Sequence, residues 1–207
     1  TLFRSLQIIV LQMAVIGIIA MVSLLAIMTI LLAVLGPLVG RIPMPALVAV
    51  LTGIAAPAMI SWRLQQRMQV QGQALFDSLV LARAEALRQR QRVTVCAVTD
   101  NDRCAPAGPW TSGWMVFVDA NANAQRESEE RVLQRHEALS EGLALEGNSL
   151  VSRYVSYGLE GRSLTISGAF QAGTLTLCHV AAAQAWHVVI NALGKPRMEK
   201  VPADGCN

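Results

Sequence analysis

Two long apolar runs near the N-terminus, neither containing a charged residue, constrain this chain more than any other feature. The first extends from Ile8 to Val39 and the second from Met44 to Trp62. The first exceeds the roughly 20 apolar residues that a membrane-spanning helix needs, and the second is close to that length although it contains Pro45 and Pro57. A signal peptide has a shorter apolar core, so we interpret the first run as a membrane segment.

The second run continues without a stop signal into a polar stretch with helical periodicity. Its apolar residues recur at spacings of three, four and seven, which places them on one face of a helix. They are Leu64, Met68, Leu75, Leu79, Ala82 and Ala86. Apart from Gly72, no helix breaker occurs between Ser61 and Gln91. We predict one helix from Met44 to Gln91, whose amphipathic second half packs on an antiparallel sheet.

Beyond Arg92 the apolar period changes to two, which is typical of strands. Clusters of Gly, Asn, Asp and Pro separate the strand-like stretches, as in an antiparallel β domain. The predicted strands are Val93–Ala97, Trp114–Val118, Tyr154–Tyr157, Leu164–Ile166, Leu175–Leu177 and Trp186–Ile190. We therefore expect an α+β fold in three parts. An extra hydrophobic segment covers residues 1–43, the long helix covers 44–92 with its membrane half at 44–62, and the β domain covers 93–207.

All four cysteines follow the apolar runs, at positions 96, 104, 178 and 206. An even number of cysteines outside a membrane indicates disulfides formed in an oxidising compartment. The residues alone allow three pairings of Cys96, Cys104, Cys178 and Cys206. A four-cysteine zinc site is the alternative, but it is disfavoured because the chain contains no C-x-x-C pair.

The sequence offers no support for catalysis. It contains no nucleophile elbow, phosphate-binding loop or H-E-x-x-H motif, and its histidines, at positions 136, 179 and 187, show no ligand spacing. The formal net charge of +3 and the pI of about 8.9 are compatible with an anionic partner. We expect a protein that is not an enzyme and that needs no cofactor.

One acidic stretch is similar to a calcium-binding loop. Asp119, Asn121, Asn123 and Glu130 occupy positions 1, 3, 5 and 12 of that template, where calcium takes oxygen ligands. Position 6 is Ala124 instead of the usual glycine, and strand-like stretches flank the loop. The alternative is a β-hairpin turn, in which Asp and Asn are favoured for their local hydrogen bonds. We prefer the turn and keep calcium as a minor hypothesis.

Several motifs, in the expected order, resemble one family. The stretch from Ile54 to Met59 resembles the membrane helix of pilins with its internal proline, and Leu79–Ala86 (LVLARAEA) looks like the family signature LxLARSEA. The first two strands of the family are matched by Val93–Cys96 and Gly113–Asp119, and the last strand and turn by Val188–Arg197. Over about residues 54–207 the chain resembles FimT/GspH-type minor pilins and pseudopilins.

This resemblance implies a pilin-like fold and a structural, filament-initiating subunit of a type IV pilus or a type II secretion system. The implied partners are other pilins or pseudopilins, inner-membrane assembly proteins and membrane lipid, and N-terminal methylation is implied as well. The chain would lie in the bacterial inner membrane with one or two spans, and its β domain in the periplasm or on a filament. The implied disulfides are Cys96–Cys104 and Cys178–Cys206. A polytopic membrane protein without a filament role is a weaker alternative.

The N-terminus departs from the family pattern. Pilins carry a glutamate near the start of the apolar helix, where it pairs with the N-terminal amine of a neighbouring subunit and so avoids an unpaired charge in the membrane. Counting back from Pro57, that glutamate would fall near Gly40, yet the first glutamate of this sequence is Glu85. We therefore describe the N-terminus as atypical.

A basic turn near the C-terminus suggests an alternative function. Gly194-Lys195-Pro196-Arg197 resembles the G-R-x-R element that in FimT-type minor pilins is associated with binding DNA for uptake, and Lys200 follows closely. Lysine in place of the first arginine keeps the charge but loses the bidentate fork. The implied role of Lys195, Arg197 and Lys200 is weak, sequence-independent DNA binding. A solvated turn without function is the other interpretation.

Overall fold

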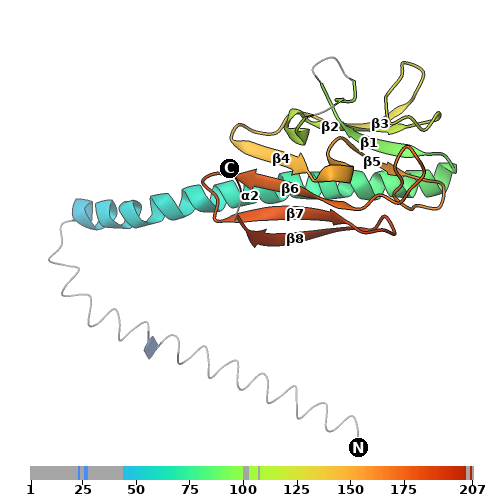
Figure 1. Cartoon of the computed structure of the whole chain (residues 1–207). Helices are drawn as coiled ribbons and strands as arrows, with labels where there is room; N and C mark the ends of the chain where they lie inside the picture. The colour runs from blue at the N-terminus through green and yellow to red at the C-terminus, as the bar shows by residue number, and fades with distance from the viewer. Residues whose placement is uncertain are drawn as a thin grey trace, which may run out of the picture. The chain divides into compact units, whose positions relative to one another are not determined.

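The computed structural model describes residues 23, 26, 27, 44–99, 103–106, 108–203 and 206 (Figure 1). The chain divides into two compact units, Thr1–Ala58 and Met59–Asn207. Almost all of the predicted membrane segment at Ile8–Val39 lies outside the described residues. Within the part that is described, no helix is both long and apolar enough to cross a membrane.

Helix α2 (Met44–Gln89) confirms the long helix expected from the sequence. The predicted stripe faces the sheets, because Met68, Leu75, Leu79, Ala82 and Ala86 are all fully buried. Close packing against the second sheet explains why glycine occupies position 72 inside the helix. A Cβ at this position would lie 3.3 Å from the Met198 sulfur and 3.7 Å from Trp186 Cβ, so glycine lets the helix approach the strands closely. The helix ends at Gln89, and the next residue, Arg90, adopts the left-handed conformation with φ 51°.

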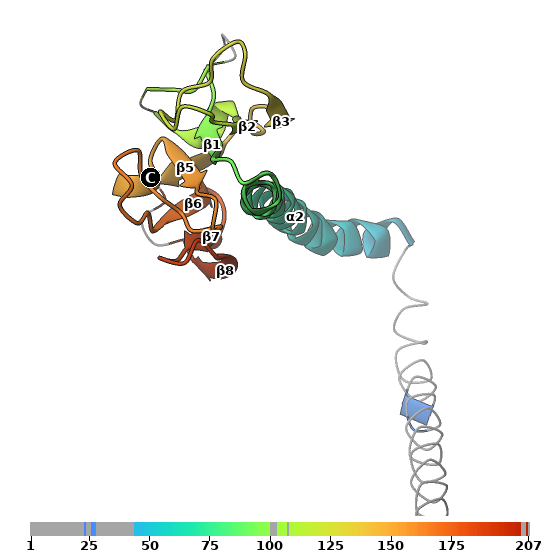
Figure 2. The ribbon, with the colours of Figure 1, turned by 90° about the vertical axis from the view of Figure 1, so that its right-hand side faces the viewer.

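The strands form two four-stranded antiparallel sheets, and α2 packs against both of them (Figure 2). The first sheet has the order β3-β2-β1-β5 and the second the order β4-β6-β7-β8. Their strands are β1 (Val93–Ala97), β2 (Trp114–Val118), β3 (Val132–His136), β4 (Leu143–Gly147), β5 (Tyr154–Tyr157), β6 (Gly173–His179), β7 (Gln184–Ile190) and β8 (Pro196–Pro202). The α+β fold with a long helix packed on antiparallel strands is therefore confirmed.

Buried apolar side chains form two clusters. The larger lies between α2 and both sheets and includes Leu79, Val95, Trp114 and Val188. The smaller lies on the opposite face of the first sheet and consists of Cys96, Val98, Cys104, Met115, Phe117, Ala124 and Tyr154. Because both faces of the first sheet are covered, every residue of β1 and β2 is buried, although the sequence suggested strands with one polar face.

One predicted strand is wrong and three strands were not predicted. Residues 164–166 form only an isolated bridge between Leu164 and Phe170 and a turn closed by the Thr165 N–H on the Ala169 carbonyl, because Gly168 with φ 84° reverses the chain. The sequence missed β3, β4 and β8. β3 is a largely polar edge strand and β8 begins and ends with proline, so neither shows strong apolar alternation.

Candidate functional site

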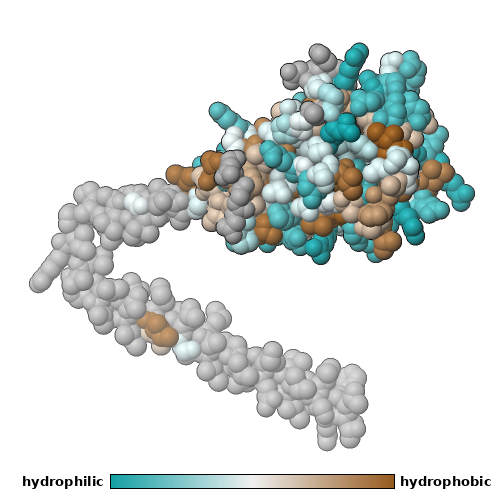
Figure 3. All heavy atoms as spheres, in the orientation of Figure 1, coloured by the Kyte–Doolittle hydropathy of each residue, from teal (hydrophilic) through white to brown (hydrophobic). Residues whose placement is uncertain are grey.

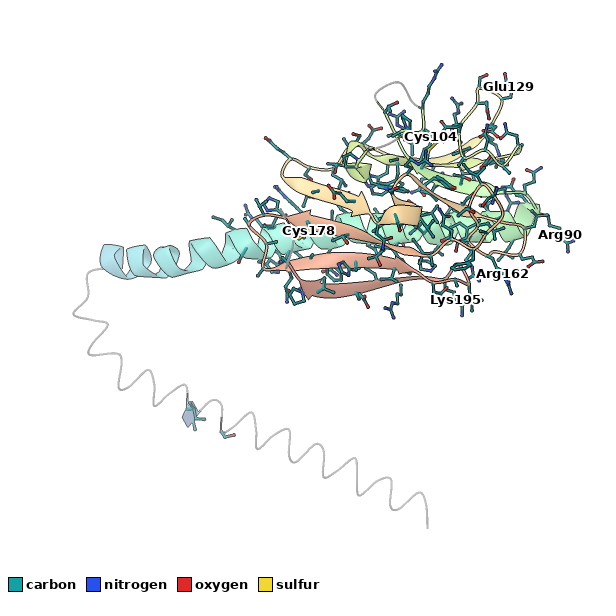
Figure 4. The ribbon with its side chains drawn as sticks, viewed as in Figure 1. Arg90, Cys104, Glu129, Arg162, Cys178 and Lys195 are labelled. Atoms are coloured by element: carbon teal, nitrogen blue, oxygen red, sulfur yellow. A yellow bond between two sulfur atoms is a disulfide. The ribbon has the colours of Figure 1, made fainter. Side chains whose placement is uncertain are left out.

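All four cysteines form disulfides, with the pairing that the family resemblance implied. Cys96 bonds to Cys104 and Cys178 to Cys206, with Cα–Cα distances of 5.5 and 5.6 Å (Figure 4). The first bond closes the loop after β1, where Val98 and Cys104 also form a β-bridge. The second ties the C-terminal residues to β6. With every cysteine oxidised, none is available as a zinc ligand.

The acidic loop after β2 uses its oxygens to hold its own backbone. Asp119 is fully buried and accepts hydrogen bonds from the Asn123 N–H at 3.0 Å, the Ala124 N–H at 3.0 Å and the Thr94 hydroxyl at 2.7 Å. Glu130 accepts from the Ala120 N–H at 2.8 Å and from the backbone N–H of Glu127 at 3.1 Å. These contacts are the turn chemistry that the sequence offered as the alternative to calcium.

Two further features of this loop bear on the calcium hypothesis. Ala124, at the template position of the glycine, has φ 56°, the left-handed conformation that position requires. The Asn123 and Asn121 amides donate to Glu127 and hold the pKa of its carboxyl below its usual range, whereas burial raises the pKa of Glu130. Among the described residues, no group of three His, Cys, Asp or Glu side chains is arranged to hold a metal ion. Calcium binding stays a prediction without geometric support.

The basic turn is built by Asn191 and Gly194. The Asn191 side-chain oxygen accepts the N–H groups of Leu193 and Lys195 at 3.0 and 2.9 Å, and Gly194 has φ 74°. A Cβ at Gly194 would lie 2.7 Å from the Gly161 carbonyl oxygen, so this turn packs against the loop that carries Arg162. Figure 4 shows Lys195 and Arg162 near each other at this end of the domain. No motif in the sequence pointed to Arg162, which lies 33 positions away from Lys195.

The three cations singled out in the sequence do not form one patch. Lys195 directly precedes β8, and Arg197 is its second residue and forms an ion pair of 3.3 Å with Glu199. Lys200 lies farther along β8, and its ammonium group is 5.7 Å from the centre of the Trp186 ring. Because side chains alternate along a strand, Lys200 and Arg197 point to opposite faces of the second sheet. The structure therefore brings Arg162 to Lys195 and separates Lys200 from both.

The face of α2 that points away from the sheets is partly apolar. Met59, Trp62, Val70 and Val80 are exposed, and Gln73 and Asp77 between them form a hydrogen bond of 2.9 Å along the helix. Apolar residues also gather on the surface where α2 enters the domain (Figure 3). A helix that already buries one stripe and exposes a second apolar surface is suited to contact another helix.

Comparison with known proteins assigns the family. The family model for the type II transport protein GspH matches residues 71–194, more than half of the chain. No curated protein matches the sequence. Similar solved structures include the type IV minor pilin FimU of Pseudomonas aeruginosa strain PAO1, with 17% identity, coverage of 70% of this chain and 96% of that chain, and a TM-score of 0.49. They also include the minor pseudopilin EpsH of the Vibrio cholerae type 2 secretion system, with 14% identity, coverage of 67% and 98%, and a TM-score of 0.42.

The family match covers the second half of α2 and both sheets up to the basic turn. Family membership, and not the lack of a catalytic motif, identifies the protein as a structural subunit rather than an enzyme. The chain belongs to the GspH family of pilin-like minor subunits of type IV pili and type II secretion systems.

Proposed function

We propose that this protein is a membrane-anchored subunit that initiates or tips a pilus or pseudopilus and packs against neighbouring subunits through the outer face of α2. The observation that carries the proposal is the second apolar surface of α2, formed by Met59, Trp62, Val70 and Val80. Burying these side chains between helices of adjacent subunits would stabilise a filament, since each buried apolar side chain contributes on the order of 1.5–3 kcal/mol.

The anchor in this proposal consists of the two charge-free runs, Ile8–Val39 and Met44–Trp62. The second run leads directly into the part of α2 that packs on the sheets, so one helix would connect the membrane to the β domain. The two disulfides support a periplasmic or filament-exposed β domain, because disulfides persist in oxidising compartments.

The filament-initiating role is supported by the surface at the C-terminal end of α2. Leu87, Leu159 and Leu193 are each about half exposed, and Leu87 lies against Gly161. A subunit inside a long uniform stack would cover this end with identical neighbours, whereas a terminal subunit can present it to a different protein. Recruitment of other pilin-like subunits is the activity that this arrangement supports.

Site-specific photo-crosslinking in cells tests the filament role. A photoreactive residue at Val70 or Val80 should link the full chain to other pilin-like subunits. The matched control is Glu146, which is exposed on the outer face of the second sheet and should give no such adduct. Equal crosslinking at all three positions, or none at Val70 and Val80, would refute packing through α2.

A second candidate function is DNA binding at the start of β8. Arg162 beside Lys195 supports it (Figure 4), although Arg162 also lies 4.0 Å from the Glu160 carboxylate, which offsets part of its charge. Arg197 contributes less, since Glu199 neutralises part of its charge. We expect weak binding without sequence preference and a shallow salt dependence, with about two or three released ions.

A gel-shift titration of the full chain with double-stranded DNA tests this second function. Replacing both Lys195 and Arg197 by alanine should remove most of the binding, and Arg162→Ala should weaken it further than Lys200→Ala. Arg67→Ala on the exposed part of α2 is the control with the same charge change as the single variants. Equal affinity of the parent and the double variant, or no binding by either, would leave the structural role alone.

A further inference from the structure

A cleft lies between the beginning of the domain part of α2 and the neighbouring ends of β7 and β8. Its volume is about 460 Å³. Its lining residues include glutamines of α2 and the glutamine that begins β7, together with the aromatic and cationic side chains of the second sheet. They are Gln65, Gln66, Gln69, Gln184, Trp186 and Lys200.

Two polar atoms at this cleft lack a hydrogen-bond partner although solvent does not reach them. They are the side-chain oxygen Oε1 of Gln65 and the indole nitrogen Nε1 of Trp186. Buried polar groups are nearly always paired, because leaving one unpaired forfeits its hydration without replacement. Because solvent does not reach these two atoms, the groups of the lining that a ligand can contact are the exposed side chains, among them the amides of Gln66 and Gln69.

The charge at the cleft indicates which ligand. Lys200 lies at its wall with its ammonium group over the Trp186 ring at 5.7 Å. The nearest acidic residue along β8, Glu199, points to the other face of the sheet and pairs with Arg197 at 3.3 Å. A cation and several exposed glutamine amides together present hydrogen-bond donors to an anion.

The position of the cleft indicates that the anion belongs to a lipid. Ser61 and Trp62 line the cleft and are also the last residues of the charge-free run Met44–Trp62. Trp62 is 58% exposed and Ile60 70% exposed, and Arg63 follows directly. Tryptophan and basic residues mark the level of the headgroups when an apolar helix leaves a membrane.

We propose that this cleft binds the phosphodiester headgroup of an anionic phospholipid, with Lys200 and the exposed amides of Gln66 and Gln69 holding the phosphate oxygens. The acyl chains would extend along the exposed apolar side chains of α2, Met59 and Ile60. The bound lipid sets the height of the β domain above the membrane before the subunit enters a filament. This inference rests on the membrane anchoring proposed above.

The test uses the full chain in neutral detergent, titrated with short-chain phosphatidylglycerol and followed by native mass spectrometry. The parent should bind the lipid, and Lys200→Gln should bind it about tenfold more weakly, the effect expected for losing one charge-assisted contact. Gln69→Ala, which removes one exposed amide donor of the lining, should weaken binding about threefold. Lys195→Gln, at the other end of β8, loses the same charge and should bind like the parent.

Comparison with other ligands distinguishes the source of the phosphate. Short-chain phosphatidylcholine and inorganic phosphate at the same concentrations should bind much more weakly than phosphatidylglycerol. Binding of inorganic phosphate as tight as that of the lipid would overturn the lipid assignment. Unchanged binding by Lys200→Gln, with intact disulfides and an unchanged unfolding midpoint, would overturn the site itself.

Vesicle flotation separates this inference from the proposed anchoring. If the full chain floats with phosphatidylcholine vesicles that contain phosphatidylglycerol but Lys200→Gln binds the lipid normally, the anchor stands and the headgroup site fails. If the full chain does not associate with vesicles at all, both proposals fail.

Discussion

The two sheets of the β domain share one helix but differ in how they are covered. The first sheet is enclosed between α2 and the smaller cluster around Phe117, under the Cys96–Cys104 loop and Ala124 of the acidic loop. The second sheet has α2 on one face only. Its other face carries a row of polar residues across the strands, formed by Glu146, Thr176, His187 and Glu199.

Because of this difference, the first sheet contributes mainly to stability, and the second sheet can take part in recognition. A strand that is buried on both faces contributes to the core at every position, so its residues are constrained by packing. A sheet with an open polar face tolerates substitution there and can present charges to partners. Arg197 on β8 lies on this open face, whereas Lys200 lies on the α2 side of the sheet and is exposed because it is near the end of the strand.

The largest expected effect concerns the enclosed face of the first sheet. Phe117→Ala should lower the free energy of unfolding by about 3–5 kcal/mol, because it removes a fully buried ring and leaves a cavity. His187→Ala on the open face of the second sheet should change it by less than about 0.5 kcal/mol. Chemical denaturation measures both. Similar losses for the two variants would contradict the difference in cover between the sheets.

The disulfides sharpen the same comparison. The bond between Cys178 and Cys206 spans 28 residues and that between Cys96 and Cys104 spans 8. On the chain-entropy model alone, their removal should cost about 3.6 and 2.5 kcal/mol respectively. Replacing each pair by alanines and comparing the denaturation midpoints tests this order. A larger loss for the shorter loop would show that burial of Cys96 and Cys104 in the smaller cluster outweighs loop length.

The acidic loop that covers the first sheet should also contribute measurably. Asp119→Ala should destabilise the protein by about 2–3 kcal/mol, because it leaves buried donors of Thr94, Asn123 and Ala124 without their charged acceptor. Glu146→Ala on the second sheet is the control and should have almost no effect. A rise in the unfolding midpoint of the parent on adding calcium, reversed by a chelator, would instead support the calcium hypothesis for this loop.

The smallest expected effect concerns α2, which both sheets share. Arg90→Gly should stabilise the protein by about 0.5–1 kcal/mol, because glycine adopts the left-handed conformation at the helix end without a Cβ penalty. Ala84→Gly, in the exposed helix interior, should destabilise it by about 1 kcal/mol. Thermal unfolding of the two variants measures the difference, and a destabilising Arg90→Gly would show that the arginine side chain has a role of its own.

The sequence by itself determined the helix and the strands whose apolar residues recur at a regular spacing. The helix from Met44 and its stripe through Leu75 and Leu79 could be predicted because burial on one face repeats every 3.6 residues. Strands β1, β2 and β5 were recognised from apolar alternation and from motifs of the family. The family itself, and through it the disulfide pairing, followed from short motifs in the right order.

Only the tertiary structure decided the features that depend on residues far apart in the chain. β3 and β8 are strands because a neighbour pairs with them, and their own side chains lack a strong apolar pattern. The position of Arg162 beside Lys195, and of Lys200 at a cleft with Gln65, depends on loops and strands that meet across the domain. The oxygens of Asp119 looked available to a metal in the sequence, and only the folded loop shows which backbone N–H groups they accept from. Such contacts arise from packing, and packing leaves no periodic trace in a single sequence.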